Sequence, residues 1–220
     1  MIDGFAELRI AVPNLGTAIT DYETLLGISG RHDDGAAKWP LANIALSLEA
    51  ASVSSPEVSA LTLWSQQTVA LPANTLGLSL DVRSTRETAD HPAEDIYAVD
   101  HIVLRTASAD ACIALFGEAL GMRLALDQAV PEWGGRMLFF RCGKLTLEVI
   151  QSLEEPVERD HFWGVTYLCG DLNATLARLD DSGVQHSGAR EGRKPGTRVA
   201  TVKSHHLGIP TLLIEPASKA

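Results

Sequence analysis

One pattern recurs along this chain, and it limits the fold more than any single motif does. The clearest copy, which is the third unit of the chain, begins at Asp100 with a stretch in which apolar and other residues alternate, as in a half-buried strand. It continues with a helical stripe that contains Ile113, Phe116 and Leu120 and ends at Gly121. Further alternating stretches complete an order of strand, helix, strand, strand, strand over about 50 residues, which is typical of one repeated unit.

Two more copies of this unit are recognisable. The first copy opens the chain, with a helix that ends at Gly27 and a late strand that ends at Glu49. The fourth copy starts at Phe162, and its helix stops at Gly183. We therefore expect four units in two pairs.

The second unit is predicted to be truncated, because residues 59–83 hold two strand patterns and no helical stretch. The polar and acidic segment after it is broken by Pro92, which is typical of a linker. The chain is therefore expected to divide into a degenerate half at 1–83, a linker at 84–98 and a second domain at 99–217.

Charge and cysteine usage exclude several classes of protein. The 220 residues carry 18 Lys and Arg against 28 Asp and Glu, so the net charge of -10 disfavours nucleic-acid binding. The apolar runs are short and the first residues are acidic, so we expect neither a membrane partner nor a signal peptide. Three cysteines are an odd number in apolar segments, which favours reduced core thiols and a cytoplasmic location.

The motifs inside the units carry a family resemblance. Asp100, His101 and Ile102 open a strand, Leu120 and Gly121 close the helix, and Leu147 and Glu148 lie in the last strand. This arrangement resembles the vicinal oxygen chelate superfamily, which includes glyoxalase I, bleomycin-resistance proteins and extradiol dioxygenases. The resemblance implies an α+β fold in which tandem βαβββ modules pair into an incomplete barrel around a central cavity.

The resemblance also implies a metal site. In the superfamily the ligands come from the first and last strands of the paired units, which are matched here by His101 and Glu148. An imidazole and a carboxylate on neighbouring strands can share one divalent ion, here Fe, Mn, Ni or Zn, and Glu148 would also serve as the catalytic base. The corresponding positions of the fourth unit fall on Trp163 and Leu212, which cannot bind a metal, so a metal-free protein remains the alternative.

A different pairing would supply further carboxylates. Glu7 occupies the place of His101 in the first unit, and Glu49 occupies the place of Glu148. If the first unit paired with the third, these four side chains would gather into one metal site. The truncated second unit leaves this pairing open as a minority hypothesis.

Basic and aromatic side chains in two loops are expected to surround the cavity. Pro195 and Gly196 favour a turn in a cationic segment, which suits a carboxylate or phosphate on a ligand. The expected substrate-binding residues are Trp133, Arg136, Trp163, Arg193, Lys194 and Arg198. The alternatives are a solvated hairpin for the charges and ordinary core packing for the aromatic rings.

Two functions follow as hypotheses. The first is a glyoxalase, bleomycin-resistance or dioxygenase-like protein that binds a small anionic organic molecule and transforms it with a divalent metal. The second is a metal-free protein that binds or sequesters such a molecule without catalysis. The degenerate first half would then serve to complete a sheet or an oligomer interface, such as that of a homodimer.

Overall fold

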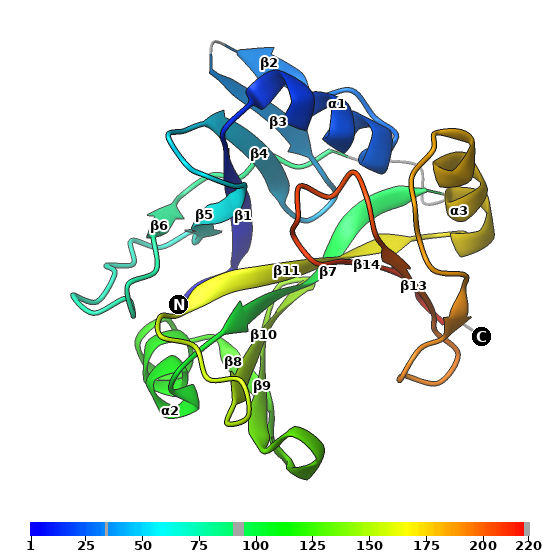
Figure 1. Cartoon of the computed structure of the whole chain (residues 1–220). Helices are drawn as coiled ribbons and strands as arrows, with labels where there is room; N and C mark the ends of the chain where they lie inside the picture. The colour runs from blue at the N-terminus through cyan, green and yellow to red at the C-terminus, as the bar shows by residue number, and fades with distance from the viewer. Residues whose placement is uncertain (34, 90–94, 218–220) are drawn as a thin grey trace.

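Two open β-sheets form the framework of the protein (Figure 1). The structure, a computed structural model, describes residues 1–33, 35–89 and 95–217, apart from the side chain of Trp133. The first sheet has six strands in the order β2-β3-β4-β1-β5-β6, and the second has eight in the order β12-β13-β14-β11-β7-β10-β9-β8. Neither sheet closes into a barrel, so the expected α+β fold with an incomplete barrel is confirmed.

The strands of the first sheet are β1 (Gly4–Val12), β2 (Arg31–Asp33), β3 (Ala36–Pro40), β4 (Ala45–Ala50), β5 (Glu57–Trp64) and β6 (Leu80–Arg83). Those of the second sheet are β7 (Ile96–Arg105), β8 (Arg123–Val130), β9 (Gly135–Cys142), β10 (Leu145–Ser152), β11 (His161–Cys169), β12 (Arg190–Glu191), β13 (Arg198–Val202) and β14 (Thr211–Glu215). The helical segments are α1 (Leu15–Leu26), α2 (Ala109–Cys112), the π-helix η1 (Ile113–Ala119), the short 3-10 turn η2 (Pro131–Trp133) and α3 (Leu172–Asp181).

Each helix lies where its unit of the repeat requires one. Asn14 caps the start of α1 by accepting a hydrogen bond from the Thr17 N–H at 3.0 Å, and Ser108 caps α2 in the same way. Gly27 ends α1 in the left-handed conformation, with φ +73°. In the third unit the helix continues as a π-helix, which the sequence pattern did not predict. The described residues between β5 and β6 contain no helix.

The units pair as first with second and third with fourth. β1 lies antiparallel to β5, and β7 lies antiparallel to β11. Within a unit the first strand runs parallel to the last, as β1 does with β4 and β7 with β10. The two ends of the eight-stranded sheet curve toward the same side, and α2 and α3 lie outside this curve (Figure 1).

One apolar core continues through both halves. Its buried members include Phe5 and Trp39 from the first sheet and Phe140 and Leu213 from the second, and they belong to a single cluster. All three cysteines are buried and free, as expected for reduced core thiols.

Polar contacts also join the two halves. The buried side chain of Asn43 donates to the Val99 carbonyl at 2.6 Å and accepts from the Val99 N–H at 3.0 Å. The Asn43 side chain therefore satisfies the backbone N–H and carbonyl of Val99 as a neighbouring strand would, two residues before His101. The division at 84–98 stays a prediction, since residues 90–94 lie outside the described residues and Ile96 already begins β7.

Arg178 connects α3 to the end of α1. Its guanidinium donates at 2.9 Å to the carbonyls of Thr24 and Leu25, and it forms an ion pair with Asp95. A Cβ at Gly27 would lie only 2.8 Å from the guanidinium carbon, so both the positive φ and the approach of Arg178 require glycine there.

We expect Arg178→Met to destabilise the protein by about 2 kcal/mol, because two helix-terminal carbonyls and one carboxylate lose their partner. Urea unfolding of the variant measures this loss. Arg123→Met, at an exposed arginine of β8, is the matched control. Equal unfolding midpoints for the two variants would contradict the connecting role of Arg178.

Candidate functional site

His101 and Glu148 lie on the same face of neighbouring parallel strands. His101 of β7 is opposite Thr146 of β10, so Glu148 is two residues further along and points to the same side of the sheet. The Nε2 atom of His101 is 3.4 Å from Oε2 of Glu148, and both side chains are largely buried. The parallel pairing of first and last strands thus brings together two groups that are 47 residues apart in the sequence.

Two further side chains orient the imidazole. The Nδ1 atom lies 2.8 Å from a carboxylate oxygen of Asp100, and because a carboxylate only accepts, Nδ1–H is the donor. In the neutral ring Nε2 is then the acceptor, and the Thr166 hydroxyl donates to it at 2.8 Å. Asp100 was part of the recognised motif, but its contact with the ring could not be derived from the sequence.

Burial raises the pKa of Glu148 above its ordinary value. His101 and Arg193 oppose this shift, and Asp100 adds to it. A carboxylate with a raised pKa is a stronger base than an ordinary glutamate, and beside an imidazole it can accept and return a proton. The pair is therefore suited to acid–base chemistry.

The fourth unit supplies no third or fourth ligand. The residue paired with His101 across the sheet is Thr166, three residues beyond the expected Trp163, and an irregularity between Phe162 and Gly164 accounts for one of these three residues. Trp163 is 41% exposed and lines another pocket, together with Val58 and Pro210. The prediction that Trp163 borders the His101 site is wrong for this reason.

In β14 the register points to Ile214 as the counterpart of Glu148. In the third unit, Glu148 lies two residues beyond the partner of His101. In the fourth unit, Leu212 is the partner of Thr166, and Ile214 lies two residues beyond Leu212. Leu212 and Ile214 share one face by strand alternation, and neither binds a metal. Glu215 points to the other face, as expected, and accepts a hydrogen bond from the Leu172 N–H of α3 at 2.7 Å.

The expected substrate-binding arginines are divided between the two sides of the sheet. Arg193, in the turn before β13, acts electrostatically on Glu148 and therefore lies near the site. Arg198 pairs instead with Glu215 at 3.5 Å and with Asn173 at 2.6 Å, at the start of α3. The side chain of Lys194 is exposed.

Arg136 also faces away from the site. Glu148 is opposite Phe139 in β9, and Arg136, three residues from Phe139, points to the opposite face. There it is held at 2.6 Å by Asp110 and by Asp127. Both Arg136 and Arg198 are therefore corrected from substrate binding to structural ion pairs, whereas the side chain of Trp133 lies outside the described residues.

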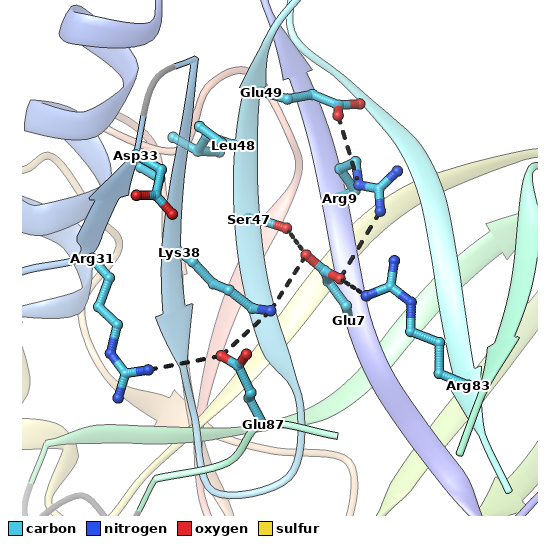
Figure 2. A pocket seen from close by; sticks show the side chains of 12 residues that line it. Glu7, Arg9, Arg31, Asp33, Lys38, Ser47, Leu48, Glu49, Arg83 and Glu87 are labelled. Carbon is cyan, nitrogen blue, oxygen red and sulfur yellow. Dashed lines mark hydrogen bonds and ion pairs between the residues drawn. The ribbon is translucent and has the colours of Figure 1, made fainter. Parts of the chain in front are cut away.

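The first unit has a polar pair of its own (Figure 2). Glu7 is opposite Ala45, so the residue that corresponds to Glu148 is Ser47 and not the expected Glu49. Ser47 donates a hydrogen bond to Glu7, and Glu49 lies two residues further along the strand, beside Arg9. Since β1 and β7 belong to different sheets, Glu7 and Glu49 do not join His101 and Glu148, and the pairing of first and third units is wrong.

The donor set at His101 does not fit a divalent ion held by the protein. Catalytic metals usually have three protein ligands, whereas this site offers one imidazole nitrogen and one carboxylate beside a threonine hydroxyl. Within the described ranges no group of three or more His, Cys, Asp or Glu side chains is placed to bind a metal.

Paired βαβββ units with a polar pair on the inner face of an open sheet define a class of protein. Residues 100–201 match the family model described as the Glyoxalase/Bleomycin resistance protein/Dioxygenase superfamily. The resemblance to the vicinal oxygen chelate superfamily is thus confirmed. A search of curated proteins gives no match.

The chain is similar to solved structures, and one of them supports the fold over its whole length. A mutant of 4-hydroxymandelate synthase from Streptomyces coelicolor aligns over 100% of this chain and 94% of its own, with 14% identity and a TM-score of 0.74. Methylmalonyl-CoA epimerase from Mycobacterium tuberculosis aligns over 56% of this chain and 90% of its own, with 22% identity and a TM-score of 0.47. The first similarity extends the fold assignment to the degenerate half. Among the described helices, none is long and apolar enough to cross a membrane.

The raised pKa of Glu148 predicts a stability change that depends on pH. The folded protein binds the proton of Glu148 more tightly than the unfolded chain, so ionisation above the ordinary pKa of 4.5 costs stability. Glu148→Gln should therefore stabilise the protein at neutral pH, and the gain should vanish at about pH 4 and below. Thermal unfolding across this pH range tests the prediction, with Glu118→Gln at an exposed glutamate as the control. A gain that is independent of pH would contradict it.

Proposed function

We propose that this protein binds a small anionic organic molecule on the inner face of the eight-stranded sheet, where the His101 and Glu148 pair moves a proton on it. The observation that carries this proposal is the 3.4 Å approach of Nε2 to the Glu148 carboxylate, with Asp100 fixing the other ring nitrogen. Arg193 supplies positive charge near the same carboxylate and would attract the anion.

The chemistry of the pair favours proton transfer next to a carbonyl group. Glu148, with its raised pKa, would take the proton from carbon, and the Thr166 hydroxyl and the imidazole would stabilise the oxygen that gains charge. Asp100 would stabilise the imidazolium when the ring holds a proton. The proposed ligand is therefore a small oxo acid, and the proposed reaction needs no redox change.

A metal-free site is part of this proposal. Superfamily members commonly bind a divalent ion, but the replacements at Thr166 and Ile214 remove two of the four positions that would hold one. We expect protein purified without chelator to contain far less than one equivalent of Fe, Mn, Ni or Zn, as measured by elemental analysis. A full equivalent that is lost in His101→Ala would overturn the metal-free version.

Sequestration without catalysis is the second candidate. The hydrogen bond from Thr166 to Nε2 favours it, because Nε2 of the neutral ring is then an acceptor and has no proton to donate to an oxygen that gains charge. Binding alone would then depend on the cation near Glu148 and on the apolar residues of the inner face.

Proton exchange distinguishes the two candidates. We expect pyruvate and 2-oxobutanoate to bind in a calorimetric titration and to exchange protons on the carbon beside the carbonyl for deuterium, as followed by NMR in D₂O. Binding should fall by at least about tenfold in His101→Ala, and exchange should be lost in Glu148→Gln. His161→Ala is the control, since the ring of His161 contacts the Arg159 carbonyl elsewhere.

Binding without exchange would establish the sequestering role and exclude catalysis. Equal binding in wild type and His101→Ala would overturn both candidates.

A cytoplasmic location is also proposed, on the support of three free and buried thiols. We propose a homodimer as the working assembly, which light scattering tests. The pairing of third and fourth units within one chain means that the His101 site does not need a second copy.

A further inference from the structure

The degenerate half contains a pocket of about 460 Å³ that the proposed function does not use (Figure 2). Strands β1 to β4, the end of β6 and the segment after β6 surround it. Its described lining contains four cationic side chains, Arg9, Arg31, Lys38 and Arg83, and four carboxylates, Glu7, Asp33, Glu49 and Glu87. The charges are therefore balanced only while all four carboxylates remain in place.

Glu7 forms the polar floor of this pocket. Its carboxylate is buried and accepts hydrogen bonds from Ser47 and, at 2.9 Å, from Arg83. Lys38 lies 3.8 Å from the same carboxylate, and Arg9 lies 4.0 Å from it. Burial alone would raise the pKa of Glu7, but Ser47 and these cations outweigh burial and lower it. Glu7 is thus a satisfied anion that positions cations.

Two cations at the outer side of the pocket, Arg31 and Lys38, have only long ion pairs to carboxylates. Arg31 and Lys38 are directly opposite each other in the β2–β3 pair, where like charges repel. Within the described part of the chain their side chains form no hydrogen bond; Arg31 and Lys38 meet Glu87 in ion pairs at 3.9 and 3.4 Å, and Lys38 also lies 3.8 Å from Glu7. These distances exceed the 2.7–3.2 Å of good N–H···O hydrogen bonds. Their donors are therefore available to an additional acceptor.

The carboxylate of Glu87 occupies the position in which an additional acceptor of Arg31 and Lys38 would bind. It comes from the segment after β6, is 54% exposed, and places its carboxylate between Arg31 and Lys38 (Figure 2). An exposed carboxylate held by two long ion pairs contributes little stability. If Glu87 moves away, the pocket is left with one more positive than negative charge.

We propose that this pocket is a second ligand site, which binds a compact oxyanion group, carboxylate or phosphate, between Arg31 and Lys38 in place of the Glu87 carboxylate. Glu87 is the internal competitor of the ligand. Glu7 is a positioning residue, since its two oxygens are already occupied by Ser47 and Arg83. The site is independent of His101 and of the function proposed above.

Titration with inorganic phosphate and with malonate, at constant ionic strength set by chloride, tests this site in the full chain. Glu87→Gln removes the competitor and should tighten the binding of the favoured anion by about 3- to 10-fold. Arg31→Met should weaken it by at least about fivefold, and its fold should persist because the Arg31 side chain is 76% exposed. A preference for phosphate would indicate a phosphorylated ligand, and a preference for malonate a carboxylic acid.

Matched controls separate the site from general charge effects. Glu57 and Arg159 form an exposed ion pair at 4.0 Å elsewhere, so Glu57→Gln and Arg159→Met should leave both affinities unchanged. His101→Ala should also leave them unchanged, which separates this site from the proposed function. Absence of saturable binding in wild type and Glu87→Gln, or equal affinity in wild type, Glu87→Gln and Arg31→Met, would overturn the proposal.

Discussion

The parallel pairing of first and last strands within each unit determines where polar groups meet in this protein. In such a pair, a residue of the first strand and the residue two places beyond its partner lie on one face. The same offset joins His101 to Glu148 in the third unit and Glu7 to Ser47 in the first. Both sites thus arise from the same pairing of a first with a last strand. Their chemistry differs only because different side chains occupy the paired positions.

The side chains on this register give the two halves different characters. In the third unit an imidazole beside a carboxylate of raised pKa makes a pair that can exchange a proton. In the first unit the carboxylate is fixed by a hydroxyl and by surrounding cations, which lower its pKa. A group held in one charge state is unsuited to proton transfer but well suited to holding cations in place. The first half therefore keeps a pocket with a chemistry different from that of the His101 site.

The fold and the His101–Glu148 approach could be predicted because they depend on local patterns and on the order of strands. The ends of strands and the pairing registers could not be predicted, since a single irregularity in one strand changes the partner of every later residue in the neighbouring strand. Thr166 and not Trp163 lies opposite His101, and the irregularity between Phe162 and Gly164 contributes one residue of that difference. The two-residue offset likewise replaced Glu49 by Ser47. Arg136 and Arg198 were misassigned because strand alternation turned them toward Asp110 and Glu215, partners distant in the sequence.

The contact of Asn43 with β7 bears on how much of the chain is needed for the second sheet to fold. Its amide completes the backbone hydrogen bonding of Val99, two residues before His101, from a loop that belongs to the other sheet. A shortened chain that kept only residues 100–201 would lose Asn43, Val99 and half of the shared apolar interior. The segment that the family model matches is therefore smaller than the piece that holds a complete apolar core and a fully paired β7.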